Sequence, residues 1–243
     1  MNGFLNLYKP KGVSSARVLN AVKRSLKGET VGHMGTLDPL ADGVLPVAIG
    51  KSTRLFDYLL DKNKEYVATV AFGFSTDSYD LEGEITQRSD VLPSDAELEA
   101  ACKKLTGDIM QIPPIYSAKC VNGKRSYELA RKGVAVELPP KKVTVKSIRV
   151  LDKISENEYK IKILCGGGTY IRAIARDLGL LCGTVATMTS LTRTASGIFR
   201  IENSVTAEEF TSAAYKSALL VPPDEVIDYP IIRLDERRTE RLY

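Results

Sequence analysis

Residues 32–45 of the chain read GHMGTLDPLADGVL. This stretch sets one carboxylate, Asp38, among glycines and directly before Pro39. The proline fixes its own φ and biases Asp38 toward an extended backbone, while the glycines permit tight turns or the close approach of a ligand. Taken alone, the pattern is also that of an ordinary Asp-Pro turn. With the rest of the chain considered, it favours a rigid loop that presents Asp38 for chemistry.

Asp38 has apolar neighbours, Leu37 and Leu40, which predict a partly dry environment for its carboxylate. An ionised acid in such a place is costly unless a cation lies beside it. We therefore expect a cationic partner elsewhere in the chain. Arg172 is the candidate, because it follows the glycine run 166–168 and stands in the first turn of a predicted helix.

The composition is that of an ordinary globular protein, with 243 residues of which 44% are hydrophobic. Such a chain can bury the core of one large domain, or of a main domain with a small appendage. No apolar run is long enough for a membrane span, and the N-terminus lacks the features of a signal peptide. We therefore expect a cytoplasmic protein with no membrane association.

The cysteines and the histidine argue against several kinds of site. The four cysteines form no Cys-x-x-Cys pair, so neither a zinc knuckle nor a disulfide framework is indicated, and reduced thiols are expected. The one histidine, His33, excludes a histidine-rich metal centre, and a Ser-His-Asp triad would have to use that residue. We expect no metal and no cofactor.

Positive charge gathers in one part of the chain. The segment from Lys119 to Lys146 holds eight cationic side chains against two carboxylates, although the whole chain has a net charge of only +4. Residues 111–131, which overlap it, mix aromatic with cationic side chains, as a surface does that stacks on bases and pairs with phosphates. The pattern suits a nucleic acid, and a solvated charged face is the alternative.

Strands and helices are predicted in irregular alternation, which favours an α+β domain built on a mixed sheet. A helix begins at Ser14 or Ser15, and another opens with a capping box at Ser94 and ends at Gly107. The remaining helices are expected at 53–60, 126–132, 170–181 and 207–218, and strands at 3–7, 44–49, 64–73, 143–151, 159–165 and 185–194.

Four motifs in order resemble the bacterial tRNA pseudouridine-55 synthases, the TruB family. The loop Gly32–Gly43 is similar to the family's catalytic motif and Lys64-Glu65-Tyr66 to its tyrosine motif. Residues 116–131 are similar to its third signature, and residues 168–172, ending at Arg172, to its arginine motif. The resemblance extends from Asn6 to about Asp224, which is essentially the catalytic domain.

The resemblance implies a pseudouridine synthase fold: a mixed, mostly antiparallel central sheet flanked by helices, with the active-site cleft across it. Residues 1–230 would form the catalytic domain, and residues 231–243 the start of a C-terminal extension whose PUA-type RNA-binding module is absent or truncated. The implied partner is the T-stem-loop of tRNA, with weakened binding in the absence of that module. The chain is expected to act as a monomer.

The resemblance also implies roles for individual residues. Asp38 is the catalytic aspartate, Arg172 its partner, Tyr66 and Tyr170 shape the uracil pocket, and Leu191 packs against the base. The RNA-binding set comprises His33, which contacts the opened loop, and the cations Lys119, Lys124, Arg125, Arg131 and Lys132. Asp80 orients Arg172, contacts RNA, or serves only as a turn residue.

Isomerising uridine requires breaking the N1–C1′ bond, turning the uracil, and bonding C5 to C1′. Ionised Asp38 would attack C1′ to give a sugar ester or take a proton from C2′ to give a glycal. Arg172 is expected to lower the pKa of Asp38, and Tyr66 to help remove the C5 proton, although a phenol is a weak base. The target nucleotide must be flipped out of the folded tRNA at a cost of a few kcal/mol.

Two other functions fit parts of the pattern. A tRNA folding chaperone would use the same basic surface and flipping residues without catalysis. A glycosidase or nucleosidase would pair Asp38 with a second carboxylate, Asp42 or Asp80, at a defined separation.

Overall fold

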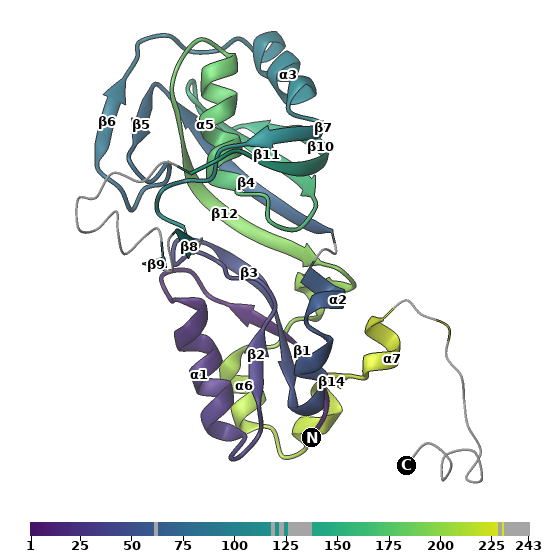
Figure 1. The fold of residues 1–243 in the computed structure, drawn as a ribbon. Coiled ribbons are helices and arrows are strands. Elements are labelled where there is room, and N and C mark those ends of the chain that lie inside the picture. The colour runs from purple at the N-terminus through teal and green to yellow at the C-terminus, as the bar shows by residue number, and fades with distance from the viewer. Residues whose placement is uncertain (61–62, 118–119, 122–123, 126–137, 228–229, 231–243) are drawn as a thin grey trace.

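The computed structural model describes residues 1–60, 63–117, 120–121, 124–125, 138–227 and 230 (Figure 1). The side chains of residues 59–60, 120–121 and 124–125 are outside this description. Two expectations from the sequence therefore lie outside the described residues: the helix at 126–132 and the C-terminal extension at 231–243.

A ten-stranded mixed sheet forms the centre of the fold, and its neighbouring strands are antiparallel except for β3 and β12. This arrangement confirms the predicted α+β class. The sheet order is β14 (Leu220–Val221), β1 (Gly3–Lys9), β3 (Asp42–Ile49), β12 (Ala186–Ser196), β4 (Lys64–Phe72), β11 (Glu158–Cys165), β10 (Lys141–Lys153) and β7 (Gly107–Gln111). Beside this path, β2 (Val31–His33) pairs with β3, and β13 (Phe199–Arg200) pairs with β12.

Two short hairpins and several helices complete the structure. The hairpins join β5 (Phe74–Thr76) to β6 (Ile85–Arg88), and β8 (Cys120–Val121) to β9 (Lys124–Arg125). The helices are α1 (Ser15–Ser25), α2 (Asp57–Leu60), α3 (Asp95–Lys104), α5 (Ile171–Leu181), α6 (Ala207–Ser212) and α7 (Pro223–Val226), with 3-10 turns η1 (Gly50–Leu55), η2 (Ile201–Asn203) and η3 (Lys216–Leu219). No helix among the described residues is long and apolar enough to cross a membrane.

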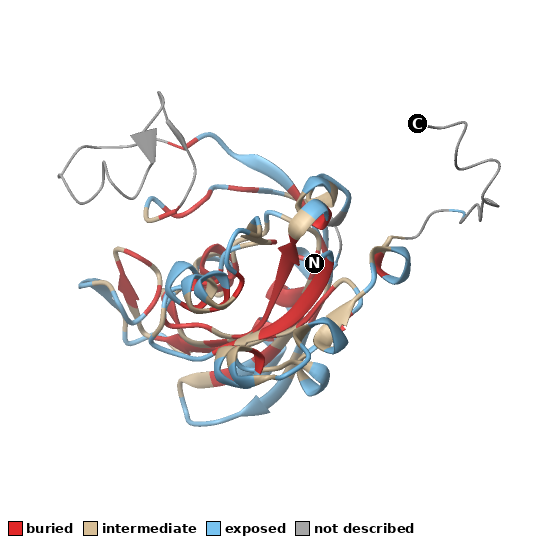
Figure 2. Ribbon diagram, turned by 90° about the horizontal axis from the view of Figure 1, so that it is seen from below, coloured by how far each residue is buried: buried red, intermediate tan, exposed pale blue. Residues whose placement is uncertain are grey.

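The sheet divides into two halves that meet where β12 runs beside β3. Figure 1 shows α3 and α5 with one half and α1 and α6 with the other. Each half has its own buried cluster, and Figure 2 shows the buried residues concentrated in the strands between the helices. Only Thr192 with Asp42 and Arg193 with Gly43 pair across the parallel join. The loop before β3 therefore lies at the boundary between the halves.

Several predicted boundaries are corrected. Gly107 begins β7 with φ +108°, and the helix before it already ends at Lys104, although the capping box of Ser94 and Glu97 is present as predicted. The expected helix 53–60 consists of η1 and α2, and the expected helix 207–218 ends at Ser212. Ser14 caps α1 by accepting from the Arg17 N–H. The strands β2, β5, β6, β7, β8, β9, β13 and β14 were not predicted.

Candidate active site

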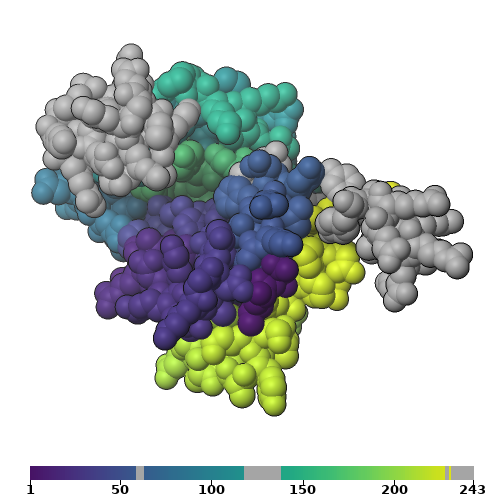
Figure 3. Space-filling model, turned by 60° about the horizontal axis from the view of Figure 1, so that its bottom comes forward, coloured from purple at the N-terminus to yellow at the C-terminus, as the bar shows by residue number. Residues whose placement is uncertain are grey.

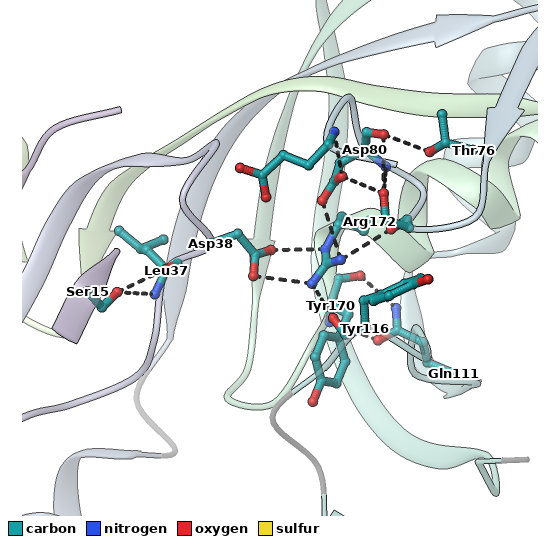
Figure 4. Close-up of polar contacts among 11 residues, drawn as sticks. Ser15, Leu37, Asp38, Thr76, Asp80, Gln111, Tyr116, Tyr170 and Arg172 are labelled. Carbon is teal, nitrogen blue, oxygen red and sulfur yellow. Dashed lines mark hydrogen bonds and ion pairs between the residues drawn. The ribbon is translucent and has the colours of Figure 1, made fainter. Parts of the chain in front are cut away.

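Asp38 lies in the loop between β2 and β3, and contacts to the flanking backbone hold this loop in place. Ser15, the first residue of α1, donates its hydroxyl to the Leu37 carbonyl and accepts from the Leu37 N–H, both at 2.9 Å (Figure 4). On the other side, the fully buried Lys9 ammonium donates to the Pro39 carbonyl at 3.4 Å and also to that of Ala41. The backbone on both sides of Asp38 is therefore held by a residue of α1, Ser15, and a residue of β1, Lys9.

Glycine is required where this loop enters β3. Gly43 has φ +105°, and a Cβ atom built on it would lie 2.3 Å from the backbone oxygen of Arg193. No side chain fits at that distance, so the absence of a Cβ lets β3 pair with β12 directly beside the loop. In the space-filling view, the purple N-terminal segment lies against the green part of the chain to which β12 belongs (Figure 3).

Arg172 makes a two-point contact with Asp38. Its Nε lies 2.9 Å from Oδ2 and its Nη2 3.2 Å from Oδ1 of the carboxylate. The arginine side chain is only 6% exposed, whereas that of Asp38 is 34% exposed. Arg172 thus holds the carboxylate from the buried side and leaves its other side open.

The guanidinium of Arg172 has as many oxygen neighbours as it has N–H groups. Besides the two oxygens of Asp38, Nη2 donates to the Tyr116 carbonyl at 2.9 Å, and Nη1 donates to the Ser78 carbonyl at 3.2 Å and lies 3.3 Å from Asp80 Oδ2 (Figure 4). Five oxygens for five N–H groups satisfy this buried cation and fix its plane. The orientation of the guanidinium is consequently set by three separate chain segments.

Asp80 is itself held in place. Its Oδ1 accepts from the Ser78 hydroxyl at 2.6 Å and from the Glu82 N–H at 3.0 Å, and its side chain is 2% exposed. The preceding residue, Tyr79, has φ +61°, the only positive φ at a non-glycine residue in the described part of the chain. Such a conformation is strained for a bulky residue and is kept here by the contacts around it. Of the roles weighed for Asp80, this geometry supports both contact with Arg172 through Oδ2 and a turn role through Oδ1.

Opposing effects set the pKa of Asp38. Burial of the carboxyl raises its pKa above the ordinary value, and the charge of Asp80 acts in the same direction, while Arg172 and Lys9 lower it. The predicted lowering effect of Arg172 is present, and the net pKa is raised because desolvation of the carboxyl outweighs it. Arg172 therefore limits a rise instead of producing a fall.

Asp38 stands where two cavities meet. A cleft of about 400 Å³ is lined by all five residues named for the active site, namely Asp38, Tyr66, Tyr170, Arg172 and Leu191. A wider groove of about 940 Å³ shares Asp38 and Arg172 with it and extends past His33. One cavity is thus suited to a single base and the other to a longer ligand.

The walls of the cleft come from the neighbouring strands β4 and β12. Tyr66 and Leu191 are each only 6% exposed, and both line the cleft. Burial raises the pKa of Tyr66, although the charge of Arg193 and a hydrogen bond with it act against the rise. A raised pKa makes the phenolate, the form that could accept a proton, scarcer near neutral pH, which weakens the role of Tyr66 in removing a proton.

Tyr170 is positioned through its backbone. The buried side chain of Gln111 donates to the Tyr170 carbonyl at 3.1 Å and accepts from the Tyr170 N–H at 2.8 Å. This clamp fixes the residue that immediately precedes α5 and Arg172. Gln111 and Ser15 are residues that sequence reasoning did not assign to the site, because their partners lie 59 and 22 positions away.

His33 lies in the wide groove and not in the cleft. Its Nδ1 is buried without a hydrogen-bond partner, and burial together with the charge of Arg193 lowers its pKa. The imidazole is therefore neutral at pH 7. This position in the groove is compatible with contact to a bound loop, and it separates His33 from the residues around the base.

The basic segment is only partly described. Lys119, Arg131 and Lys132 lie outside the described residues, and Lys124 and Arg125 belong to β9 without a description of their side chains. Lys141 lines the cleft, and Lys142 pairs with Asp108 at 2.9 Å. The described part of the chain contains no cluster of three His, Cys, Asp or Glu side chains suited to a metal ion.

Another cavity, of about 410 Å³, lies apart from the cleft. It contains Glu65, which faces the opposite side of β4 from Tyr66 because side chains alternate along a strand. The Glu65 carboxylate is paired with Lys162 at 3.0 Å, and it accepts from the Thr194 hydroxyl at 2.8 Å. The residues named for catalysis are all absent from its lining.

Comparison with protein families assigns almost the whole described chain. Residues 23–171 match the model described as TruB family pseudouridylate synthase (N terminal domain), and residues 172–227 match the one described as tRNA pseudouridylate synthase B C-terminal domain. The tRNA pseudouridine synthase B of Synechocystis sp. is 44% identical over 249 residues, which cover 100% of this chain and 84% of the relative. That of Francisella philomiragia is 40% identical, covering 100% of this chain and 82% of the relative.

Solved structures agree with the fold. The protein in a crystal structure of a Cbf5-Nop10-Gar1 complex superimposes with a TM-score of 0.67 and 32% identity over 88% of this chain. A structure of an H/ACA RNP bound to a substrate RNA containing 2′-deoxyuridine gives a TM-score of 0.64 and 30% identity over 88% of this chain. The chain spans 54% and 53%, about half, of these two proteins.

Proposed function

The chain belongs to the TruB family of pseudouridylate synthases, and from this premise we propose how its cleft acts on a uridine of tRNA. Relatives that are 44% and 40% identical across the full chain are tRNA pseudouridine synthases, and the chain is an isomerase of the same kind. The finer substrate is the uridine at position 55 in the T-stem-loop. The remaining parts of the proposal are a monomeric, cytoplasmic enzyme whose catalytic domain comprises residues 1–230.

The observation that supports this mechanism best is the placement of the Asp38–Arg172 pair at the junction of the cleft and the groove. A nucleotide flipped out of an RNA loop in the groove would bring its base into the cleft and its sugar beside Asp38. Tyr66 and Leu191 would then face the base from the walls of the cleft. Because the cleft confines the base, it could turn without being lost between bond cleavage and bond formation.

Asp38 is the group that acts on the sugar. Its ionised carboxylate attacks C1′, or it takes the proton from C2′, and in both routes the N1–C1′ bond breaks and C5 later bonds to C1′. Arg172 keeps the carboxylate in one orientation and favours its charged form. Arg172 also contacts buried Asp80 and two backbone carbonyls. These contacts hold its guanidinium in place when the substrate binds.

The groove is the proposed place of the RNA. His33 would occupy space vacated by the flipped nucleotide, and the basic segment with Lys119, Lys124, Arg125, Arg131 and Lys132 would contact phosphates. Stacking and phosphate contacts together must offset the few kcal/mol that unstacking costs.

The test uses tRNA that carries tritium at C5 of its uridines. We expect the natural chain to release tritium, and Asp38→Asn to release none while it still binds the tRNA. Tritium release by Asp38→Asn at the normal rate would contradict the role of Asp38. Binding and refolding of tRNA without any release by the natural chain would instead indicate a folding chaperone.

The nucleosidase alternative requires a second free carboxylate near Asp38. Of the two carboxylates weighed for this role, Asp80 has its oxygens taken by Arg172, the Ser78 hydroxyl and the Glu82 N–H. Asp42 lines neither the cleft nor the groove. A hydrolase would also release free uracil, which chromatography of the reaction mixture would detect.

A further inference from the structure

Arg193 is a buried cation whose contacts are all with neutral groups. It lies on β12 with 1% of its surface exposed, and it donates through Nε to the Val44 carbonyl at 2.7 Å and through Nη2 to the Gly35 carbonyl at 3.1 Å. The phenol of Tyr66, its cross-strand partner, is the third neighbour. No carboxylate of the described residues forms an ion pair with it, so only neutral dipoles offset the cost of burying its charge.

Other cationic side chains line the cleft near Arg193 and add to the positive electrostatic potential there. Arg193 lines the cleft together with Lys141 and Arg172, and Asp38 is the one carboxylate among the described residues of that lining. Gly35 lies beside Arg193 and Lys64, since a Cβ built on it would be at ordinary contact distance from both, 3.6 Å from Arg193 Nη1 and 3.7 Å from Lys64 Cε. Since Asp38 is already held by Arg172, the cleft is suited to receive a further negative charge.

The reaction proposed above produces such a charge. When the N1–C1′ bond breaks, its electron pair stays on N1, and the detached uracil is an anion whose charge spreads over N1, O2 and O4. The pair formed at C5 by this delocalisation then bonds to C1′, the C5 proton leaves, and N1 takes up a proton. The base is therefore negatively charged only while it is detached.

We propose that Arg193 stabilises the detached uracil anion in the cleft. This inference rests on the proposed function and adds a group that acts on the leaving base, whereas Asp38 acts on the sugar. A fixed cation in a largely buried site acts strongly on charge that develops during the reaction, because it needs no reorganisation. Its two carbonyl contacts hold the guanidinium beside Tyr66 before the substrate arrives.

An RNA phosphate is the other anion that Arg193 could bind, and its position argues against this ligand. Arg193 lines the cleft but is absent from the lining of the wide groove, where the backbone of a bound loop would run. A backbone phosphate would have to enter the cleft with the base in order to reach it. The base is the smaller group and the one that the chemistry requires there.

The test measures single-turnover rates at saturating T-stem-loop RNA with uridine, 5-deuterouridine or 5-fluorouridine at the target. Cleavage of the N1–C1′ bond is followed with all three, and product formation with the first two, because 5-fluorouridine has no C5 proton to lose. Arg193→Gln should slow the reaction of uridine by on the order of a hundredfold to a thousandfold, as expected for the loss of one fixed charge-stabilising donor. Fluorine makes uracil a better leaving anion, so the loss with 5-fluorouridine should be about tenfold smaller. Arg193→Lys, which keeps the charge, should recover a large part of the rate and serves as the second variant if the glutamine variant is unstable.

Three results would overturn the proposal. Equal losses with uridine and 5-fluorouridine would mean that Arg193 only supports the loop. A new isotope effect with 5-deuterouridine would mean that it acts on removal of the C5 proton through Tyr66. Weaker RNA binding with an unchanged single-turnover rate would make it a phosphate ligand. Thr194→Val, a change on the same strand at a residue that contacts Glu65 outside the cleft, is the matched control, and Asp38→Asn shows separately whether the proposed function holds.

Discussion

The guanidinium of Arg172 meets the carboxylate of Asp38 side-on, with Nε 2.9 Å from one oxygen and Nη2 3.2 Å from the other. Two parallel contacts restrict rotation of the carboxylate, which a single contact does not. The contact with Arg172 therefore determines the direction in which Asp38 faces the cleft, and it also favours the ionised form of the Asp38 carboxyl.

Arg172→Lys should separate these two effects. The lysine retains a positive charge but cannot match the planar two-point contact or reach the same five oxygens. We expect kcat to fall on the order of a hundredfold with little change in tRNA affinity, measured by single-turnover kinetics and filter binding. A rate within about twofold of the natural chain would show that charge alone suffices.

The pH dependence of kcat/KM should report the raised pKa of Asp38. Because the ionised form is the active one, activity falls as pH drops through this pKa, and the acidic limb should lie above the ordinary aspartate value of about 4. Asp80 raises the pKa of Asp38, so Asp80→Asn should move the limb to lower pH even though it lowers the maximal rate. A limb that stays in place or moves upward in this variant would contradict the electrostatic order described for the site.

The contact between Ser15 and Leu37 should affect both stability and activity. Ser15→Ala leaves the buried N–H and carbonyl of Leu37 without their partner, which should lower the free energy of unfolding by about 1–3 kcal/mol. The rate should fall as well, because Leu37 immediately precedes Asp38.

Ser94→Ala provides the matched control. It removes the cap of α3, remote from both cavities, and should cost about 1 kcal/mol without changing kcat. Urea denaturation of the two variants measures the free energy of unfolding, and steady-state kinetics measure kcat. Equal effects on kcat would mean that Ser15 has no particular influence on the loop.

Binding of the T-stem-loop should depend steeply on salt concentration. Each cation that neutralises a phosphate contributes about 0.9 to the slope of log K against log salt for a duplex, and about 0.7 for a single strand. Lys124→Ala and Arg125→Ala should each reduce the slope by about 1, while Lys104→Ala, at the end of α3 and in neither cavity, should leave it unchanged. A flat response to salt would remove the basic segment from the interface.

Local patterns were sufficient for part of this structure. The capping box at Ser94, the alternation of β4 and the apolar face of α5 each arise from neighbouring residues, and these elements were predicted close to their observed bounds. Gly107 was misplaced because a glycine after a helix resembles a stop signal, whereas here it starts an edge strand. Short strands such as β2 and β13 owe their existence to longer neighbours, which no local pattern shows.

The site shows the same division. The loop around Asp38 stands out in sequence because proline and glycines restrict it locally. The contacts that complete the site, such as Gln111 with Tyr170 and the Ser78 carbonyl with Arg172, join positions 59 and 94 apart and depend on the tertiary fold. The net direction of the Asp38 pKa shift likewise depends on burial, which the sequence does not supply as a quantity.

The five oxygens around Arg172 belong to three segments, at Asp38, at residues 78–80 and at Tyr116, which are 134, 92–94 and 56 positions away along the chain. No fragment shorter than residues 38–172 holds them all. In a molecule whose two sheet halves have not packed together, Asp38 is present but Arg172 does not orient it. Such a molecule is expected to be inactive. Catalysis in this protein therefore requires that these segments have folded together, so enzymatic activity reports on the assembly of the two halves of the sheet.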